Sequence, residues 1–158
     1  EKGRRWDRAL RLFSEMQDAR VELDVVAWSA AISACENGQR WEQALRLLLA
    51  MQNHNATPDV IAFSAAASAC EKAQQWERTL WLLKEMQLSG VLPNVLTYCS
   101  AITAHERLHR WEFVLQLFQR MLRHRLAPDV FTVREATSAF EKGQQRRCAH
   151  RMGKLAEA

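Results

Sequence analysis

The sequence lacks any long apolar run, and it lacks the motifs that most enzyme classes need. No segment approaches the roughly 18 apolar residues of a membrane span, and no signal or transit segment is visible. There is no Walker A loop, no nucleophile elbow and no pair of carboxylates in an evident pocket. We therefore expect no membrane partner, no cofactor and no enzymatic activity.

The sequence also lacks closely spaced cysteine pairs, and its first 119 residues lack an excess of positive charge. The four cysteines, Cys35, Cys70, Cys99 and Cys148, form no C-x-x-C motif, and we interpret them as small buried thiols in a reducing compartment. Residues 1–119 hold 13 Lys and Arg against 14 Asp and Glu, whereas residues 120–158 hold 9 against 4. The basic excess belongs to the C-terminal quarter, so the net charge of +4 does not by itself indicate nucleic-acid binding.

What the sequence does contain is an internal repeat of 35 residues. Segment 69–86 reads ACEKAQQWERTLWLLKEM, and segments 34–51 and 104–121 follow the same pattern. The anchors recur every 35 residues: Trp6, Trp41, Trp76 and Trp111, and Met16, Met51, Met86 and Met121. Such a period indicates a solenoid, because a unit this small cannot bury a core alone and must stack on its neighbours.

Each repeat holds two amphipathic helices. The first helix has an apolar stripe at i, i+4 and i+7, formed in successive copies by Trp28, Ile32 and Cys35, by Phe63, Ala67 and Cys70, and by Tyr98, Ile102 and His105. Residues 25–37 form the first copy of this helix, and the second helix is expected over about residues 41–52, 76–88 and 111–123. We expect the repeated Trp that opens each second helix to be buried.

The junctions between helices carry start and stop residues. Asp24, Asp59, Asn94 and Asp129 are good N-cap types for the helices that follow them. The prolines before three of them, Pro58, Pro93 and Pro128, are expected to end the preceding helices. Gly38 and Gly143 suit a left-handed residue just past a first helix.

These signals predict one all-α domain over residues 1–158, an α-solenoid of stacked helix-turn-helix repeats. Residues 25–59, 60–94 and 95–129 are complete repeats, and residues 1–24 are a partial one. Residues 130–158 are a degenerate or capping partial repeat, because Arg146 replaces the repeated Trp and Gly153 stands where Leu would be.

The pattern V-x-[TA]-[WFY]-x-A-x-I-x-A-[CH]-E, then W-E-x-x-L-x-L-[LF]-x-x-M, then P-[DN], resembles the 35-residue motif of the pentatricopeptide repeat family. The Trp in the second helix departs from the commonest consensus and is similar to that of algal or protist members. The resemblance implies a right-handed superhelix that binds single-stranded RNA on its concave face, about one base per repeat. It also implies organellar RNA processing, stability, editing or translation, and hence a mitochondrion or plastid.

By this resemblance the fifth and last residues of each repeat hydrogen-bond one base, and the pairs are Ser29 with Asp59, Ser64 with Asn94, and Cys99 with Asp129. A small hydroxyl with Asp favours G and with Asn favours A, so the implied tract is 5′-G-A-x. The second residues, Val26, Ile61, Leu96 and Phe131, would wedge between bases. Lys72, Arg107 and Lys142 stand where family members often hold phosphate. Arg134, a fifth residue without a partner, departs from the pattern.

Two alternatives stay open. From the residues alone, Asp59, Asn94 and Asp129 could serve only as N-caps. The array could instead be a protein-binding scaffold of tetratricopeptide type, and protein partners or self-association are compatible with its near-neutral central repeats. The segment from His105 to His109 spells H-E-x-x-H, but its second His falls in the predicted turn, so we expect no metal site.

Overall fold

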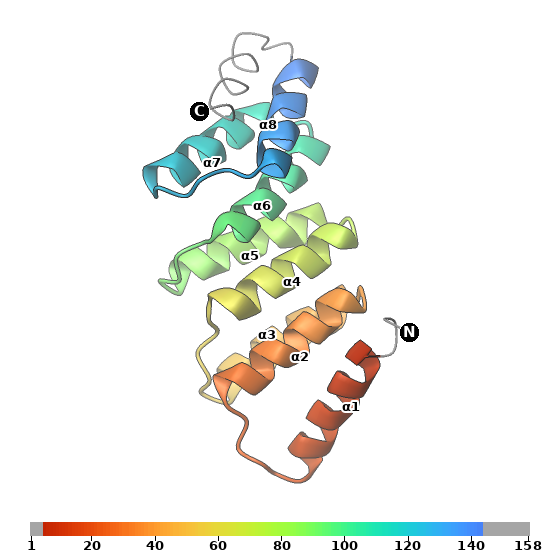
Figure 1. Ribbon diagram of the computed structural model, residues 1–158. Helices are drawn as coiled ribbons and strands as arrows, with labels where there is room; N and C mark the ends of the chain where they lie inside the picture. The colour runs from red at the N-terminus through yellow and green to blue at the C-terminus, as the bar shows by residue number, and fades with distance from the viewer. Residues whose placement is uncertain (1–4, 144–158) are drawn as a thin grey trace.

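A computed structural model describes residues 5–143 of the chain, which form eight α-helices (Figure 1). The prediction of an all-α repeat solenoid is confirmed. The helices are α1 (Arg5–Asp18), α2 (Val25–Asn37), α3 (Trp41–Asn53), α4 (Val60–Lys72), α5 (Trp76–Leu88), α6 (Val95–Arg107), α7 (Trp111–Arg123) and α8 (Val130–Lys142). From α2 onward, each hairpin of two helices follows the last at the 35-residue period of the sequence.

The predicted N-caps open all four first helices. The Oδ1 atoms of Asp24 and Asp59 each accept a hydrogen bond from the backbone N–H three residues later, at 2.8 Å in both cases. Asn94 and Asp129 do the same at 2.9 and 2.7 Å. Each side chain thereby satisfies one of the backbone donors that a helix start leaves free.

The helix ends differ from the prediction. Gly38 and Gly143 have φ values of −87° and −78°, and the left-handed residue after α2 is the next one, Gln39, with φ 54°. Glycine is needed at these two positions because a larger side chain would collide with a tryptophan ring. A Cβ atom would lie 2.8 Å from the Trp6 ring at Gly38 and 2.5 Å from the Trp111 ring at Gly143.

The prolines do not end the second helices either. Helix α3 ends at Asn53, and left-handed Asn55 closes it through a bond from the Ala56 N–H to the Met51 carbonyl of 3.1 Å. This is a Schellman-type ending, which leaves Pro58 outside the helix, three residues beyond Asn55. Proline there fixes the extended entry into the next N-cap.

The helices form two layers with different contacts. The first helices α2, α4, α6 and α8 pack on one another in a continuous stack, and each of α3, α5 and α7 packs against first helices (Figure 1). Within the described residues, the backbones of α3, α5 and α7 do not pack on one another, and an exposed hydrogen bond of 3.3 Å from Arg120 on α7 to Gln87 on α5 links two of these helices. The layer of first helices is therefore the more closely packed one.

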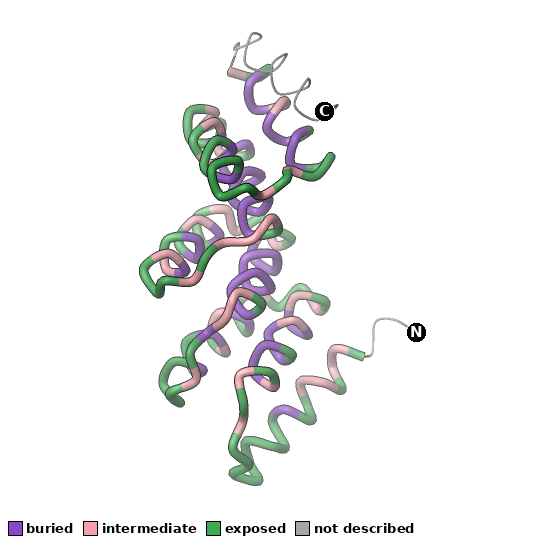
Figure 2. The backbone as a smooth tube through the Cα atoms, turned by 60° about the vertical axis from the view of Figure 1, so that its left-hand side comes forward, coloured by how far each residue is buried: buried purple, intermediate pink, exposed green. Residues whose placement is uncertain are grey.

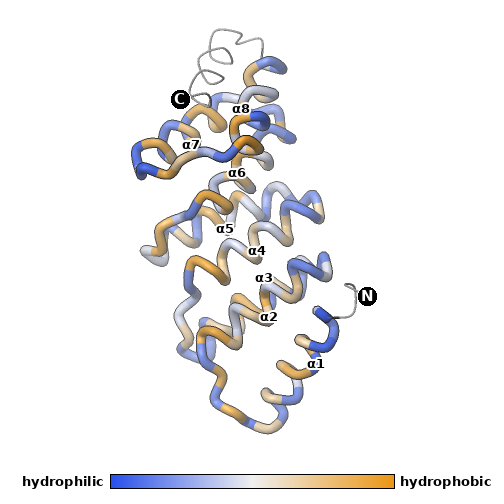
Figure 3. The backbone as a smooth tube through the Cα atoms, in the orientation of Figure 1, coloured by the Kyte–Doolittle hydropathy of each residue, from blue (hydrophilic) through white to orange (hydrophobic). Residues whose placement is uncertain are grey.

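The core lies in the stack of first helices. The predicted apolar stripes of α2, α4 and α6 are buried, and the burial follows this stack through the molecule (Figure 2). Alanines such as Ala65, Ala66 and Ala67 allow close approach, so α4 is buried on nearly every side. Hydrophilic residues gather at the ends of the hairpins (Figure 3).

The repeated tryptophans are only half-buried, so the prediction that they are buried is wrong in degree. Trp6 packs its ring over Gly38 of the following repeat, and the Arg40 guanidinium lies 5.5 Å from its ring centre. The ring is thus held between two repeats at the molecular edge. The fully buried tryptophan is Trp28, which meets Phe13 edge-on at 5.0 Å. No helix among residues 5–143 is both long and apolar enough to span a bilayer.

Candidate nucleic-acid interface

Two of the three predicted base-reading pairs are joined by direct hydrogen bonds. The Ser29 hydroxyl donates to Asp59 Oδ1 at 3.1 Å, and the Ser64 hydroxyl lies 3.2 Å from Asn94 Oδ1. The two residues of each pair are 30 positions apart in the sequence. They meet because the last residue of one repeat caps the first helix of the next repeat, and that helix packs on the preceding first helix, which carries the serine. The N-cap role and the pairing with the fifth residue therefore occur together, on the same oxygen atom.

The free atoms of these pairs belong to the last residue and not to the serine. Ser29 and Ser64 are each only 4% exposed. Asp59 Oδ2 and Asn94 Nδ2 have no hydrogen-bond partner among the described residues. An oxygen can only accept a hydrogen bond, whereas the amide nitrogen can only donate. The two sites therefore present opposite chemistry to a ligand.

The third pair is not joined in the same way. Cys99 is buried, and no hydrogen bond links it to Asp129 within the described residues. Burial raises the pKa of the Cys99 thiol, the adjacent Thr132 hydroxyl opposes this, and Asp129 is among the carboxylates that add to it. A neutral thiol is a weak donor and acceptor, so this pair offers a base little beyond the Asp129 carboxylate.

The four predicted wedge residues form a row of exposed apolar side chains, one from each first helix. Val26 is 73% exposed, Ile61 57%, Leu96 46% and Phe131 41%. Each lies one turn before the fifth residue of its helix, so it shares a helix face with it. Apolar side chains at this exposure contribute little to the core, and they are free to contact flat ligand groups.

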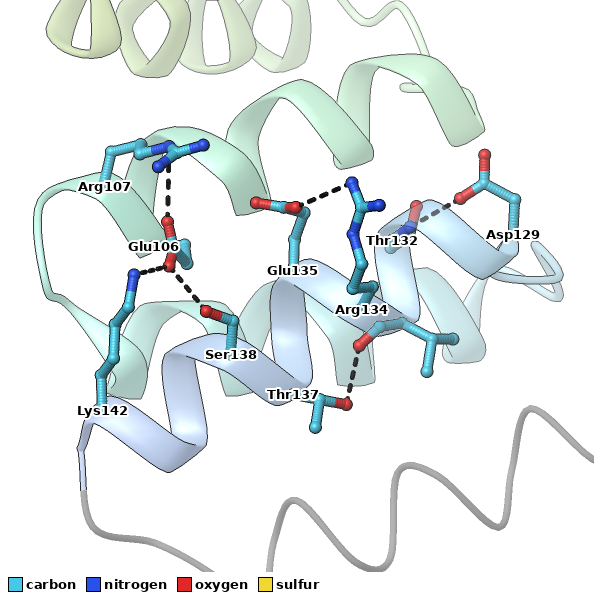
Figure 4. A network of polar contacts seen from close by, with 10 residues as sticks. Glu106, Arg107, Asp129, Thr132, Arg134, Glu135, Thr137, Ser138 and Lys142 are labelled. Carbon is cyan, nitrogen blue, oxygen red and sulfur yellow. Dashed lines mark hydrogen bonds and ion pairs between the residues drawn. The ribbon is translucent and has the colours of Figure 1, made fainter.

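Two of the predicted phosphate contacts are already paired with carboxylates. Glu36 Oε1 accepts hydrogen bonds from Lys72 Nζ and from the Ser68 hydroxyl, both at 2.7 Å. Glu106 accepts in the same way from Lys142 and from the Ser138 hydroxyl (Figure 4). We name these two inter-repeat groups the carboxylate clamps. In both, a phosphate would have to compete with glutamate for the lysine.

The electrostatics of the second clamp follow from its burial. Burial by itself raises the pKa of the Glu106 carboxyl, but the hydrogen bonds from Lys142 and Ser138 and the charges of Lys142 and Arg107 outweigh it. The pKa therefore lies below its ordinary value, and Glu106 stays ionised. Arg107, the remaining predicted phosphate contact, is half-exposed and lies 3.6 Å from Glu106 Oε2.

The interface between α4 and α6, which lies between the two clamps, has no matching set of hydrogen bonds among the described residues. Glu71 stands at the glutamate position, but the buried Thr103 hydroxyl has no hydrogen-bond partner in the described part of the chain. Arg107, at the lysine position, turns to Glu106 instead. Burial raises the pKa of the Glu71 carboxyl, Lys72 and Arg107 oppose the rise, and the Glu135 charge adds to it.

The fifth residue of the last repeat is arranged differently from the others. The Arg134 guanidinium lies 4.7 Å from the centre of the Phe131 ring. Its Nη2 lies 3.3 Å from Glu135 Oε1 (Figure 4). Glu135 is nearly buried, and Arg134 is its one hydrogen-bond partner within residues 5–143. The arginine is therefore held in place while most of its side chain faces solvent.

The H-E-x-x-H segment does not have the geometry of a zinc site. His105 lies on α6, whereas His109 follows the end of the helix with φ 55°. His105 is buried and stacked on Phe113 at 5.0 Å, with an interplanar angle of 7°. Burial, helped by the Arg110 charge, lowers its pKa to about 4. It is therefore a neutral core residue.

Two groups of residues that contribute to these contacts were not predicted from the sequence. Thr97 donates its hydroxyl to Asn94 Oδ1 at 2.8 Å and lies 3.2 Å from the Ser64 hydroxyl. The change from Ala62 to Thr97 at the third repeat position was the available signal. The clamps could have been found from glutamates and hydroxyls at fixed repeat positions: Glu36, Glu71, Glu106 and Glu141, with Ser33, Ser68, Thr103 and Ser138.

A family model described as the pentacotripeptide-repeat region of PRORP matches residues 2–153. The chain belongs to this pentatricopeptide repeat family. Among curated protein sequences, none matches the chain.

Solved pentatricopeptide structures share the fold. The chain is similar to the PPR domain of Arabidopsis thaliana protein-only RNase P 1 in complex with tRNA, with a TM-score of 0.83 and 14% identity, over 96% of this chain and 80% of that one. It is similar to PPR10 in complex with an 18-nt psaJ RNA element, with a TM-score of 0.72, 16% identity and 96% of this chain covered. Maize PPR10 alone gives 0.64, 24% identity and 98% coverage. The chain spans 22% of the length of PPR10 in both cases.

Proposed function

We propose that this chain is a sequence-specific, single-stranded RNA-binding module that reads about one base per repeat on the face of its first helices. The observation that carries this proposal is the pair of hydrogen-bonded sites, Ser29 with Asp59 and Ser64 with Asn94, each beside an exposed apolar side chain. Unpaired bases can stack on such side chains and present their edges to hydrogen-bonding groups. The recognition units are the repeats 25–59, 60–94 and 95–129.

The proposed tract is 5′-G-A-x, running from the N-terminal to the C-terminal repeat. The free Asp59 oxygen accepts hydrogen bonds, and the Watson–Crick edge of guanine offers N–H donors to it. The free Asn94 amide nitrogen donates, and the edge of adenine offers ring nitrogens as acceptors. Cys99 with Asp129 defines no base. Lys72, Arg107 and Lys142 are proposed to approach phosphates, the two lysines after exchange from their glutamates.

The test is equilibrium binding of short single-stranded RNAs that carry G-A, A-G or C-C at the two central positions. Fluorescence anisotropy at fixed, stated salt should rank G-A first, because each mismatched base removes one of the two hydrogen-bonded readings. A matched DNA oligomer and the Ser29→Ala, Ser64→Ala double variant serve as controls. Equal affinity for all three RNAs would contradict sequence-specific recognition.

A second candidate ligand is a folded RNA of the tRNA type. The matching family model and the tRNA complex of the Arabidopsis thaliana relative favour it. Including an unmodified tRNA transcript and its denatured form in the same titration separates the two. Preference for the folded transcript over every oligomer would favour shape recognition by the array.

We propose that this part of the chain recognises RNA and performs no chemistry. Within residues 5–143, histidine, cysteine, aspartate and glutamate side chains form no group of three that could hold a metal ion. The family supports a role in organellar RNA processing, in a mitochondrion or plastid. The rival, a protein-binding scaffold of tetratricopeptide type, predicts no measurable affinity for any RNA in the titration.

A further inference from the structure

The last first helix, α8, carries a combination of groups that no other first helix has. At the second and fifth positions α2, α4 and α6 present an aliphatic residue with Ser or Cys, whereas α8 presents Phe131 with Arg134. The two side chains are in contact, with the guanidinium 4.7 Å from the ring centre. Both are exposed, so the contact stands on the surface at the end of the row of wedge residues, of which Phe131 is the last.

The arginine has two side-chain contacts. Its Nη2 is tied to Glu135, a nearly buried carboxylate on the same helix turn, and the phenyl ring supports the guanidinium plane from one side. A guanidinium has five N–H donors in a rigid fork, and only Nη2 is engaged among the described residues. The remaining donors have no hydrogen-bond partner among the described residues and face solvent.

The charges around Arg134 favour a base over a phosphate as its ligand. Glu135 lies beside Arg134, and Asp129 adds a second carboxylate at the start of the same helix (Figure 4). Their negative charge opposes a phosphate, whereas a base carries no net charge. Among the bases, guanine presents two adjacent acceptors, N7 and O6, which a guanidinium fork contacts in pairs. A neighbouring aromatic ring adds stacking that does not depend on sequence.

We propose that Phe131 and Arg134 form a guanine-binding site for the nucleotide that follows the G-A-x tract. Phe131 stacks against the base step, and Arg134 donates two hydrogen bonds to the N7 and O6 edge. Glu135 is a positioning residue that holds the guanidinium. The inference rests on the proposed function, because it places the nucleotide by extending the same strand one repeat further.

The experiment uses four RNAs that share G-A-C and differ only in the next base. For the unaltered chain we expect the guanine RNA to bind about 5- to 100-fold more tightly than the other three. Arg134→Gln should remove this preference and leave the dependence on G-A intact. Arg134→Lys should keep the charge but lose most of the preference, since an ammonium group is a point donor without the fork.

Two further variants complete the design. Phe131→Leu, which installs the residue found at the equivalent position 96, should weaken binding of all four RNAs and reduce the guanine preference. Arg123→Gln removes the same charge from an exposed residue at the end of α7, and it should leave the preference unchanged.

The outcomes separate this inference from the proposed function. If G-A dependence is retained but the next base makes no difference, the guanine site is wrong and the proposed function stands. If Arg134→Gln weakens all four RNAs equally, the arginine contacts a phosphate, and the guanine site is again overturned. If no RNA binds, both proposals fall.

Discussion

Asn94 illustrates how one side chain serves the fold and the proposed reading of a base with different atoms. Its Oδ1 caps α6, accepts from the Thr97 hydroxyl and lies 3.2 Å from the Ser64 hydroxyl, whereas Nδ2 has no partner among the described residues. Asp59 caps α4 with the same geometry at 2.8 Å. A carboxylate is therefore compatible with the cap, and the free atom can be changed without changing the helix start.

Asn94→Asp should move the preference at the second base from adenine towards guanine, because the free atom changes from a donor to an acceptor. Stability should change by less than about 1 kcal/mol, since the cap is kept. Anisotropy with G-A and G-G RNAs measures the change, and Asp24→Asn, a cap outside the predicted pairs, is the control. An unchanged base order would rule out the role of Asn94 while leaving the fold untouched.

His105 makes a prediction about acid stability. Its pKa is about 4 in the folded chain, below the ordinary value of 6.5. Between these values the unfolded chain holds the proton and the folded chain does not, so stability falls as the pH is lowered from about 6.5 towards 4. At pH 4.5 this group should cost about 2 kcal/mol relative to pH 7.

His105→Cys installs the residue that Cys35 and Cys70 provide at the same repeat position, and it should remove this part of the acid sensitivity. Urea unfolding at pH 7 and pH 4.5 for both proteins isolates it from the titration of the carboxylates, which both share. Equal acid sensitivity in the two proteins would show that His105 takes up its proton without unfolding.

At the scale of the helix, the sequence was sufficient for most boundaries. The Asp24 cap predicted the start of α2, and the repeated Trp at the 35-residue spacing predicted the starts of α5 and α7, so that all three helices have the predicted bounds. The endings could not be predicted because left-handed Gln39, Asn55 and His109 carry no glycine signal. Their conformation follows from the hydrogen bonds that close each helix, such as Ala56 N–H to Met51 C=O. Those bonds stabilise an otherwise unfavourable backbone.

The carboxylate clamps are contacts between repeats that could not be predicted from the sequence. Lys72 and Lys142 are typical phosphate-binding residues by type, but their partners, Glu36 and Glu106, come from the preceding repeat at a separation of 36 residues. Only the packing of α2 on α4 and of α6 on α8 reveals that each lysine has a carboxylate within reach.

The two clamps should differ in strength. The Glu106 side chain is 2% exposed and that of Glu36 is 21% exposed, so solvent screens the first pair far less. We expect Glu106→Gln to lower the free energy of unfolding by about 1–2 kcal/mol and Glu36→Gln by under about 1 kcal/mol. Urea denaturation of both variants provides the comparison. A larger loss for Glu36→Gln would contradict this ranking by burial.

At the scale of the whole molecule, charge is distributed unevenly along the array. The repeats up to residue 119 are near neutral, and part of the C-terminal excess, including Arg146 and Arg147, lies outside the described residues. The interpretation of residues 130–158 as a degenerate or capping repeat stays a prediction, and residues 144–158 lie outside the described part of the chain. Base preference and general attraction to RNA should reside in different parts of the chain.

Replacing both Arg146 and Arg147 with Gln tests this separation. The variant should weaken binding to all RNAs by a similar factor and reduce the slope of log K against log salt by at most about 1.4, since each phosphate contact contributes about 0.7 for a single strand. Preference for G-A should persist. Loss of that preference would place base recognition in the C-terminal quarter.

The arrangement of the two layers has a mechanical consequence. The first helices touch along the whole stack, whereas the backbones of α3, α5 and α7 stay apart within the described residues, with α5 and α7 linked by the exposed hydrogen bond from Arg120 to Gln87. The array is packed mainly along one edge, so we expect it to bend by opening or closing the outer layer while the distance between successive first helices stays the same. The spacing of the proposed reading positions would then be independent of the curvature. Such a scaffold can follow an RNA strand through turns of different tightness without losing register with its bases.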